Sequence, residues 1–238
     1  GPPPNGGQAN PRHGGGLIDF DRSYHGLDAR LTWRWNETAL VTGISQDRQS
    51  DARRGFLNYT GTQASPVYGG VGALRRDENN QAKSRDVYAQ LDWPIGQAFT
   101  LSAGLRAGKV RLAAADNYLS NGDDSGQRDF SYTNPVLGLR YAITAQLNLH
   151  ASVARGFESP TLGELAYRVD GTGGFNTDLN AQKSKQAEIG MKWRSTSGAL
   201  SADAALFNVQ VDDEIGVATN AGGRQSFQNV GRTLREGA

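Results

Sequence analysis

The chain has 238 residues, no cysteine, 31 glycines and a formal net charge of +1 at neutral pH. The lack of cysteine excludes disulfide bonds and thiolate metal sites, and the near-zero net charge gives no reason to expect nucleic acid as a partner. No run of about 18 apolar residues occurs, which excludes a transmembrane helix, whereas a membrane-spanning β-strand needs only every second residue to be apolar over about ten residues.

The N-terminal stretch GPPPNGGQANPRHGGG is rich in glycine and proline and predicts a loop, so residues 1–22 are expected to form an N-terminal loop. It has none of the basic and apolar regions of a signal peptide. The chain is therefore expected to begin inside a longer protein.

The first predicted hairpin covers residues 27–47. Leu27, Ala29, Leu31, Trp33 and Trp35 alternate with polar residues, which places them on one face of a strand. Asn36 and Glu37 form the turn, and residues 38–47 return the chain. A long polar loop is expected over residues 48–83.

Three more hairpins follow the same plan. Residues 87–93 and 99–107 alternate around a turn at residues 94–97, and a polar loop is expected at residues 113–129. Residues 137–141 and 147–153 form the third hairpin, followed by a glycine-rich excursion over residues 156–183. Residues 187–193 and 199–211 form the fourth, and a ninth strand is expected to start near Ser226.

Two regularities connect these hairpins. The connections alternate between short turns and long polar loops, as in membrane β-barrels. Aromatic residues stand on the apolar face at the end of a strand just before each short turn, at Trp35, Trp93, Tyr141 and Trp193. These four residues predict a girdle at a membrane interface, although large aromatics at strand ends also occur in soluble β-sandwiches. The predicted fold class is all-β: an antiparallel transmembrane β-barrel fragment of about eight or nine strands, with short periplasmic turns and long extracellular loops.

Motifs in the second half of the chain resemble those of TonB-dependent outer-membrane receptors. ARGF at residues 154–157 followed by SPTLGEL at residues 159–165 is similar to a late barrel hairpin of that family. SKQAEIGMKW at 184–193, ALFNVQVDDEI at 205–215 and QNVGRTLREG at 228–237 resemble its next strands in the same order. The resemblance covers residues 84–238 through motifs and the first 83 residues only through their pattern.

The resemblance implies a barrel of about 22 strands in the bacterial outer membrane, filled by an N-terminal plug domain. It also implies active uptake of a scarce ligand, most commonly a ferric siderophore, with energy supplied by TonB–ExbB–ExbD through an N-terminal peptide. Residues 1–238 would then be a partial barrel, without the plug domain, the TonB-contacting peptide and the closing strands. Outer-membrane lipid and lipopolysaccharide are the expected surroundings.

The ligand site is predicted from paired arginines. Arg53, Arg54, Arg75 and Arg76 fall in one expected loop, and guanidinium pairs suit an anionic chelate. The alternative is that these arginines contact lipopolysaccharide phosphates or balance nearby carboxylates.

Parts of the sequence also fit other functions. YRVDGTGGFNTDLNAQKS at residues 167–184 resembles the receptor branch for pyrroloquinoline quinone, a tricarboxylate. A passive porin or a soluble all-β binding module would share the strand alternation. His13, His25 and His150 have no metal-ligand spacing, and His150 with Ser152 has no evident acidic partner, so neither an enzyme, a metal site nor a cofactor is expected.

Overall fold

The computed structural model of the protein describes residues 16–62, 64–221 and 224–238. Its main feature is an antiparallel sheet in the order β1-β2-β5-β6-β7-β8-β9-β10-β13. Its strands are β1 (Gly16–Trp35), β2 (Thr38–Leu57), β5 (Leu74–Ile95), β6 (Phe99–Asp116), β7 (Gly126–Ala142), β8 (Leu147–Glu158), β9 (Gln182–Arg194), β10 (Ser201–Asp212) and β13 (Thr233–Gly237). Two short hairpins complete the fold, β3 (Tyr59–Gly61) with β4 (Pro66–Tyr68) and β11 (Ile215–Ala221) with β12 (Arg224–Asn229).

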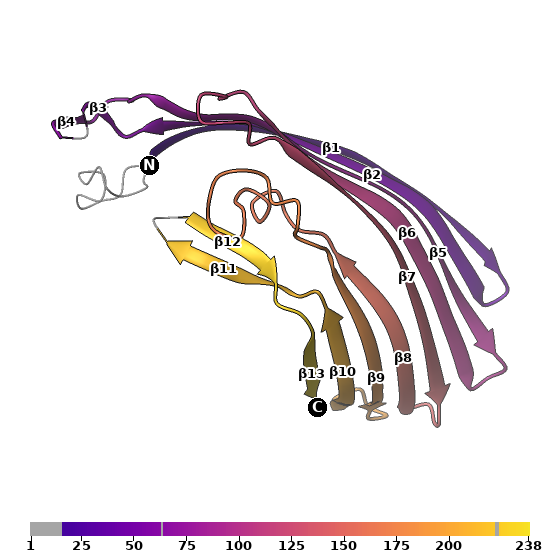
Figure 1. Ribbon diagram of the computed structural model, residues 1–238. Helices are drawn as coiled ribbons and strands as arrows, with labels where there is room; N and C mark the ends of the chain where they lie inside the picture. The colour runs from indigo at the N-terminus through magenta and orange to yellow at the C-terminus, as the bar shows by residue number, and fades with distance from the viewer. Residues whose placement is uncertain (1–15, 63, 222–223) are drawn as a thin grey trace.

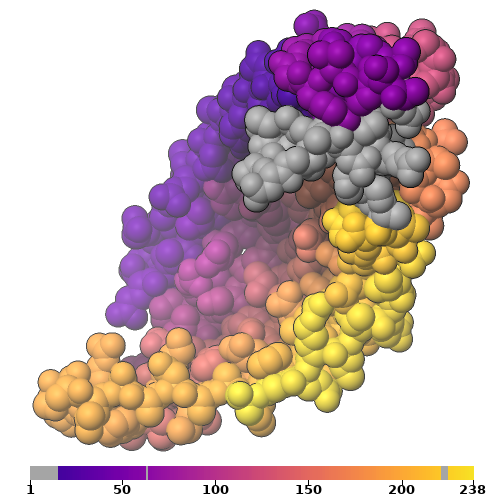
Figure 2. Space-filling model, turned by 90° about the vertical axis from the view of Figure 1, so that its left-hand side faces the viewer, coloured from indigo at the N-terminus to yellow at the C-terminus, as the bar shows by residue number. Residues whose placement is uncertain are grey.

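The sheet is strongly curved, and the β8–β9 connection and the β11–β12 hairpin lie on its concave side (Figure 1). Short turns join the strands at one end of the sheet, and the longer connections lie at the other. We call these the turn end and the loop end. From the side, the indigo N-terminal strands and the yellow C-terminal segment face each other across a hollow (Figure 2). Within the described ranges, no helix is long and apolar enough to cross a bilayer.

The two faces of the sheet differ in chemistry because successive side chains of a strand point to opposite sides. The convex outer face carries the apolar residues, and they remain exposed: Leu31 is 62% exposed, Ile189 60% and Leu105 49%. In the half of the sheet nearest the short turns, the outer-face positions of β1, β2 and the strands from β5 to β10 carry no charged residue. An exposed apolar face of this extent needs a partner other than water.

The strands reach well beyond the apolar region, which corrects three of the predicted boundaries. Residues 16–22 belong to β1 and not to an N-terminal loop. The predicted loop at 48–83 is mostly strand, because β2 runs to Leu57 and β5 begins at Leu74. The predicted loop at 113–129 likewise shrinks to the residues between Asp116 and Gly126. The extensions of β2 and β5 are largely polar on both faces, so they lack the apolar alternation. Nevertheless β2 stays paired with β1 as far as Leu57, and β5 stays paired with β6 as far as Glu78.

The length of β1 exceeds what is needed to cross a membrane. A strand of 20 residues spans roughly 66 Å, about twice the hydrocarbon thickness of a bilayer. Cross-strand pairs hold the projecting part together, as where Arg22 Nε lies 2.8 Å from Asp51 Oδ1.

The ninth strand of the sheet differs from the prediction. The segment around Ser226 is β12, which pairs with β11 away from the main sheet. The strand that continues the sheet is β13, which pairs with β10 from Phe207 opposite Gly237 to Val211 opposite Thr233. The sequence pattern found strand-forming residues here but could not assign their partner.

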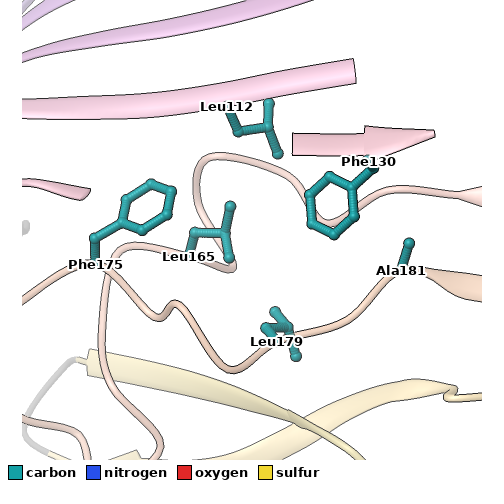
Figure 3. Close-up of a cluster of buried hydrophobic side chains, with 6 residues drawn as sticks. All are labelled: Leu112, Phe130, Leu165, Phe175, Leu179 and Ala181. Atoms are coloured by element: carbon teal, nitrogen blue, oxygen red, sulfur yellow. The ribbon is translucent and has the colours of Figure 1, made fainter. Parts of the chain in front are cut away.

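The main cluster of buried hydrophobic side chains lies on the inner face at the loop end (Figure 3). Leu112 of β6 and Phe130 of β7 point inward and meet residues of the β8–β9 connection. Leu165 is fully buried and Leu179 is 1% exposed. Residues 159–181, which we call the inward loop, are thus packed onto the sheet. The cluster consists of Leu112, Phe130, Leu165, Phe175, Leu179 and Ala181.

The assignment of residues to the two faces predicts that substitutions at adjacent positions of β5 change the stability of the protein by different amounts. Ala89 lies on the outer face, level with Leu105, and Gln90 lies on the inner face opposite Gly104. We expect Ala89→Arg in the full-length protein to lower the free energy of unfolding from lipid vesicles by about 2–4 kcal/mol, because the charge would enter hydrocarbon. Gln90→Arg should change it little. Equal losses for the two variants, measured by denaturant titration, would contradict the assignment.

Candidate ligand-binding site

The inward loop is built around the SPTLGEL motif. The Thr161 Oγ1 accepts a hydrogen bond from the Glu164 backbone N–H at 3.2 Å, and the Glu164 carboxylate accepts one from the Thr161 N–H at 2.7 Å. This reciprocal arrangement is that of a capping box, here closing a turn instead of a helix. Pro160 and Leu165 at its two sides are fully buried. The motif therefore fixes the loop on the inner face of the sheet.

Asparagine side chains join the inward loop to the β11–β12 hairpin. Asn176 Nδ2 donates to the Phe227 carbonyl at 3.0 Å, and Asn229 accepts from the Asn180 N–H at 2.8 Å while donating to the Asn180 carbonyl at 3.0 Å. Ser226, with no exposed surface, donates to the Val169 carbonyl at 2.9 Å. Because these polar groups satisfy one another, the loop and the hairpin form one body.

Arg128 ties this body to the sheet. Its Nη2 donates to Asn180 Oδ1 at 2.9 Å, and its guanidinium lies over the ring of Phe130, with Cζ 5.2 Å from the ring centre. A guanidinium over a ring face is attracted by the ring quadrupole. The inward loop is thus held both by apolar packing and by a charged contact from β7.

A cavity of about 250 Å³ lies between the inward loop and the loop ends of β2, β5 and β6. Three of the four predicted arginines, Arg53, Arg75 and Arg76, line it. Tyr167 of the inward loop closes one side, with Arg76 Cζ 5.1 Å from the centre of its ring. The structure thus brings together arginines from two strands and an aromatic residue nearly a hundred positions further along the chain.

Carboxylates in the same cavity balance part of this charge. Glu78 Oε1 lies 3.0 Å from Arg76 Nε, and Glu78 Oε2 lies 3.9 Å from Arg53 Nη1. The latter distance is too long for a hydrogen bond, so in the described residues the Arg53 guanidinium has N–H groups to offer a ligand. The Asp116 carboxylate accepts hydrogen bonds from the backbone N–H groups of Tyr118 and Asp124, at 2.9 and 3.1 Å, and so orders the wall of the cavity.

A turn of the inward loop positions Tyr167 and Gly173, which form an isolated bridge. The hydroxyl and backbone N–H of Thr172 donate to Asp170 Oδ1 at 2.7 and 2.9 Å. The Thr172 hydroxyl, followed by its N–H, holds the pKa of Asp170 below its usual range. A lowered carboxyl pKa means that this contribution to stability is present at neutral pH and is lost only as the pH falls through the folded pKa.

Arg54, the fourth predicted arginine, is not part of the cavity. It lies on the outer face, one position along β2 from the inward-facing Arg53, and its Nε is 3.7 Å from Asp77 Oδ2. The sequence pairs Arg53 with Arg54 and Arg75 with Arg76 because they are adjacent, but adjacent strand residues point in opposite directions. Arg75 lines the cavity together with its neighbour Arg76, because the pairing register shifts between Gly55 and Phe56 on the partner strand.

The four predicted girdle residues, Trp35, Trp93, Tyr141 and Trp193, all lie at the turn end on the outer face, between 37% and 49% exposed. Tyr141 stacks on Phe99 of the neighbouring strand with ring centres 4.6 Å apart. Their placement is compatible with a membrane interface, and the girdle remains a prediction.

Sequence reasoning missed an acidic partner for His150. Its Nε2 lies 3.2 Å from Glu188 Oε1 on the inner face, and Ser152 is opposite Glu188 in the pairing of β8 with β9. A period-2 pattern cannot reveal which residue of a neighbouring strand faces a given side chain. Tyr167 was missed as well, because the contact of a loop residue with the sheet depends on tertiary packing and leaves no local sequence pattern.

The family model described as TonB dependent receptor-like, beta-barrel, matches residues 2–238. The chain therefore belongs to the TonB-dependent receptor β-barrel family, whose members are outer-membrane receptors and transporters and not enzymes. This places the sheet in the wall of an outer-membrane barrel, with its convex face toward lipid.

Solved structures share this fold. The copper transporter OprC matches with a TM-score of 0.74 at 18% identity over 92% of this chain and 35% of its own. The ferric-catecholate import receptor Fiu from E. coli gives 0.61 at 17% identity, over 93% of this chain and 35% of its own. The FrpB iron transporter from Neisseria meningitidis gives 0.63 at 19% identity, over 92% and 32%. The chain thus spans about a third of the length of these proteins.

Leu165→Ala tests whether the inward loop is held by the buried cluster. Removing a fully buried leucine leaves a cavity, and we expect the local free energy of opening to fall by about 2–5 kcal/mol. Hydrogen exchange of the full-length receptor should then show faster exchange at Leu165 and Asn176, whose amides are hydrogen-bonded within the loop. Leu119→Ala, at a leucine that is 63% exposed, is the matched control and should change nothing. Unaltered protection in Leu165→Ala would show that the cluster does not hold the loop.

Proposed function

We propose that this barrel serves TonB-dependent uptake of a scarce anionic ligand across the outer membrane, and that the ligand is a ferric siderophore. Energy would come from TonB–ExbB–ExbD, acting through parts of the receptor outside this chain. Family membership supports the mechanism over a passive porin or a soluble binding module. The relatives named above as a ferric-catecholate receptor and an iron transporter support the cargo, although the copper transporter with the same fold shows that the fold leaves the cargo open.

The observation that carries the proposal is the convergence of Arg53, Arg75 and Arg76 on one cavity with Tyr167. Guanidinium groups bind carboxylate or catecholate oxygens through several parallel N–H groups, and an aromatic side chain adds a flat contact surface. Ferric chelates of these ligands carry negative charge and planar donor groups. The cavity opens on the inner face at the loop end, where a ligand arriving from outside the cell would first meet the barrel.

The second candidate is pyrroloquinoline quinone, a planar tricarboxylate. The same three guanidinium groups suit its carboxylates, and Tyr167 suits its rings. The sequence of the inward loop from Tyr167 onward favours this branch. Both candidates require an anion in the same cavity. Competition between the two ligands distinguishes them, whereas substitution of the arginines tests whether the cavity binds an anionic ligand.

The triple variant Arg53→Ala, Arg75→Ala, Arg76→Ala in the full-length receptor tests the cavity. A hydrogen bond to a charged group contributes about 1.5–3 kcal/mol, so we expect the affinity for the anionic ligand to fall by at least about tenfold. The measurement is binding and uptake of radiolabelled ferric catecholate, ferric citrate and pyrroloquinoline quinone by cells with equal surface expression.

Arg54→Ala is the matched control, since Arg54 neighbours Arg53 in the chain but lies on the opposite face with Asp77. We expect its binding and uptake to equal those of the unaltered receptor. Unchanged affinity in the triple variant for every ligand that the receptor transports would remove the cavity from the binding site. Uptake that persists without TonB would refute the energised mechanism.

A further inference from the structure

The cavity at the loop end contains as many carboxylates as guanidinium groups. The carboxylates belong to Glu78, Asp116 and Asp124, so their formal charges cancel those of the three arginines that line the same cavity. A purely anionic ligand would be repelled by carboxylates that face it, because like charges interact strongly in a partly buried site. The presence of both signs favours a ligand that also carries both.

Two of the three carboxylates are already bound within the protein. Glu78 forms the ion pair with Arg76, at 3.0 Å. Asp116 accepts the backbone N–H groups of Tyr118 and Asp124, one on each of its carboxylate oxygens. These two acidic side chains therefore stabilise the walls of the cavity.

Asp124 is held by its backbone, and its carboxylate is left unbound. Its N–H donates to Asp116 Oδ2 at 3.1 Å, and its carbonyl oxygen accepts from the Phe175 N–H at 3.2 Å. These bonds tie the β6–β7 connection to the inward loop. Within the described ranges, no hydrogen bond or ion pair reaches the partly buried Asp124 carboxylate. A cationic group of a ligand would supply the missing partner.

Gly173 brings the Asp124 carboxylate next to the turn that carries Tyr167. A Cβ atom at Gly173 would lie 2.9 Å from Asp124 Oδ2, and Gly173 forms the isolated bridge with Tyr167. The side chains of Asp124 and Tyr167 both line the cavity. A carboxylate and an aromatic ring in one site suit an alkylammonium group, because the ring quadrupole adds to the ionic attraction.

A small neighbouring cavity has the size of an ammonium group. Its volume is about 20 Å³, and it shares Arg53, Glu78 and Asp124 with the larger cavity. Leu165 and Phe175 of the buried cluster also line it (Figure 3). This volume has room for about one water molecule, and an ammonium group is of similar size. A ligand with neighbouring anionic and ammonium groups can therefore contact Arg53 and Asp124 together.

We propose that the transported chelate carries a protonated amine beside its anionic donor groups, and that the Asp124 carboxylate binds this amine. The inference rests on the proposed uptake of an anionic ligand through the arginine cavity and narrows the class of that ligand. Metal chelators that are built from amino acids and keep a free amine belong to the class. Pyrroloquinoline quinone, a tricarboxylate without an amine, does not belong to it.

The test is the affinity of the purified full-length receptor for two matched probes, measured by isothermal titration calorimetry. The probes are the ferric complexes of dihydroxybenzoyl-lysine with its side-chain amine free and of the same compound with that amine acetylated. We expect the complex with the free amine to bind about tenfold or more tightly, since acetylation removes a charge-assisted hydrogen bond. Equal affinities, or no binding of either complex, would overturn the proposal.

Asp124→Asn should abolish the preference for the free amine. The acetylated complex should bind this variant at least as tightly as it binds the unaltered receptor, because a carboxylate that repels catecholate oxygens has been removed. The charge-conserving Asp124→Glu should keep a preference for the free amine. Loss of both complexes in Asp124→Asn, or a preference that persists there undiminished, would show that Asp124 does not bind the amine.

Asp123→Asn is the matched control, because the neighbouring carboxylate has the same charge, is exposed and lies outside the cavity lining in the described part of the chain. Its preference for the free amine should be unchanged. The triple arginine variant separates this inference from the proposed function. If that variant loses both complexes while the unaltered receptor binds them equally, the amine site is wrong and anion binding stands. Undiminished binding of both complexes to the triple variant would refute the arginine site itself.

Discussion

The structure depends on one constraint: every backbone N–H and C=O in the part of the chain that meets lipid must pair within the sheet. An antiparallel ladder meets this requirement and at the same time sends alternate side chains to opposite faces. One face can then be apolar without a second protein layer, and the other can be charged. The paired strands β1 and β2 show both results, with Leu31 exposed on the outer face and Arg22 bound to Asp51 on the inner face.

The same ladder explains how the proposed ligand site can lie at a distance from the membrane. Because the strands continue past the apolar band, their inner faces provide a rigid wall on which the inward loop packs. The hydrogen bonds of Asn176 and Asn229 then join loop and hairpin, and Tyr167 is brought to the arginines of β2 and β5. Rigid support of this kind favours binding, since less conformational freedom is lost when a ligand arrives.

The alternation in the sequence was sufficient to predict the strands near the short turns, their faces and the fold class, and the ordered motifs predicted the family. It could not predict how far β2 and β5 extend, because polar residues on both faces leave no period to detect. It also placed Arg54 with Arg53, although a strand separates neighbours onto opposite faces. The alternation could not predict the partners of Tyr167 and Glu188. Cross-strand partners depend on register, and loop-to-sheet partners depend on tertiary packing, and neither leaves a local pattern in a single sequence.

The central claim is that the convex face touches hydrocarbon, and β6 allows it to be measured directly. This chain contains no cysteine, so single cysteines from Phe99 to Ala107 can carry a spin label in the receptor reconstituted into vesicles. We expect collisions with oxygen, which concentrates in lipid, to be strongest at odd positions such as Leu105, and collisions with a water-soluble nickel chelate to be strongest at even positions such as Arg106. An absence of this two-residue period, or its opposite phase, would contradict the account.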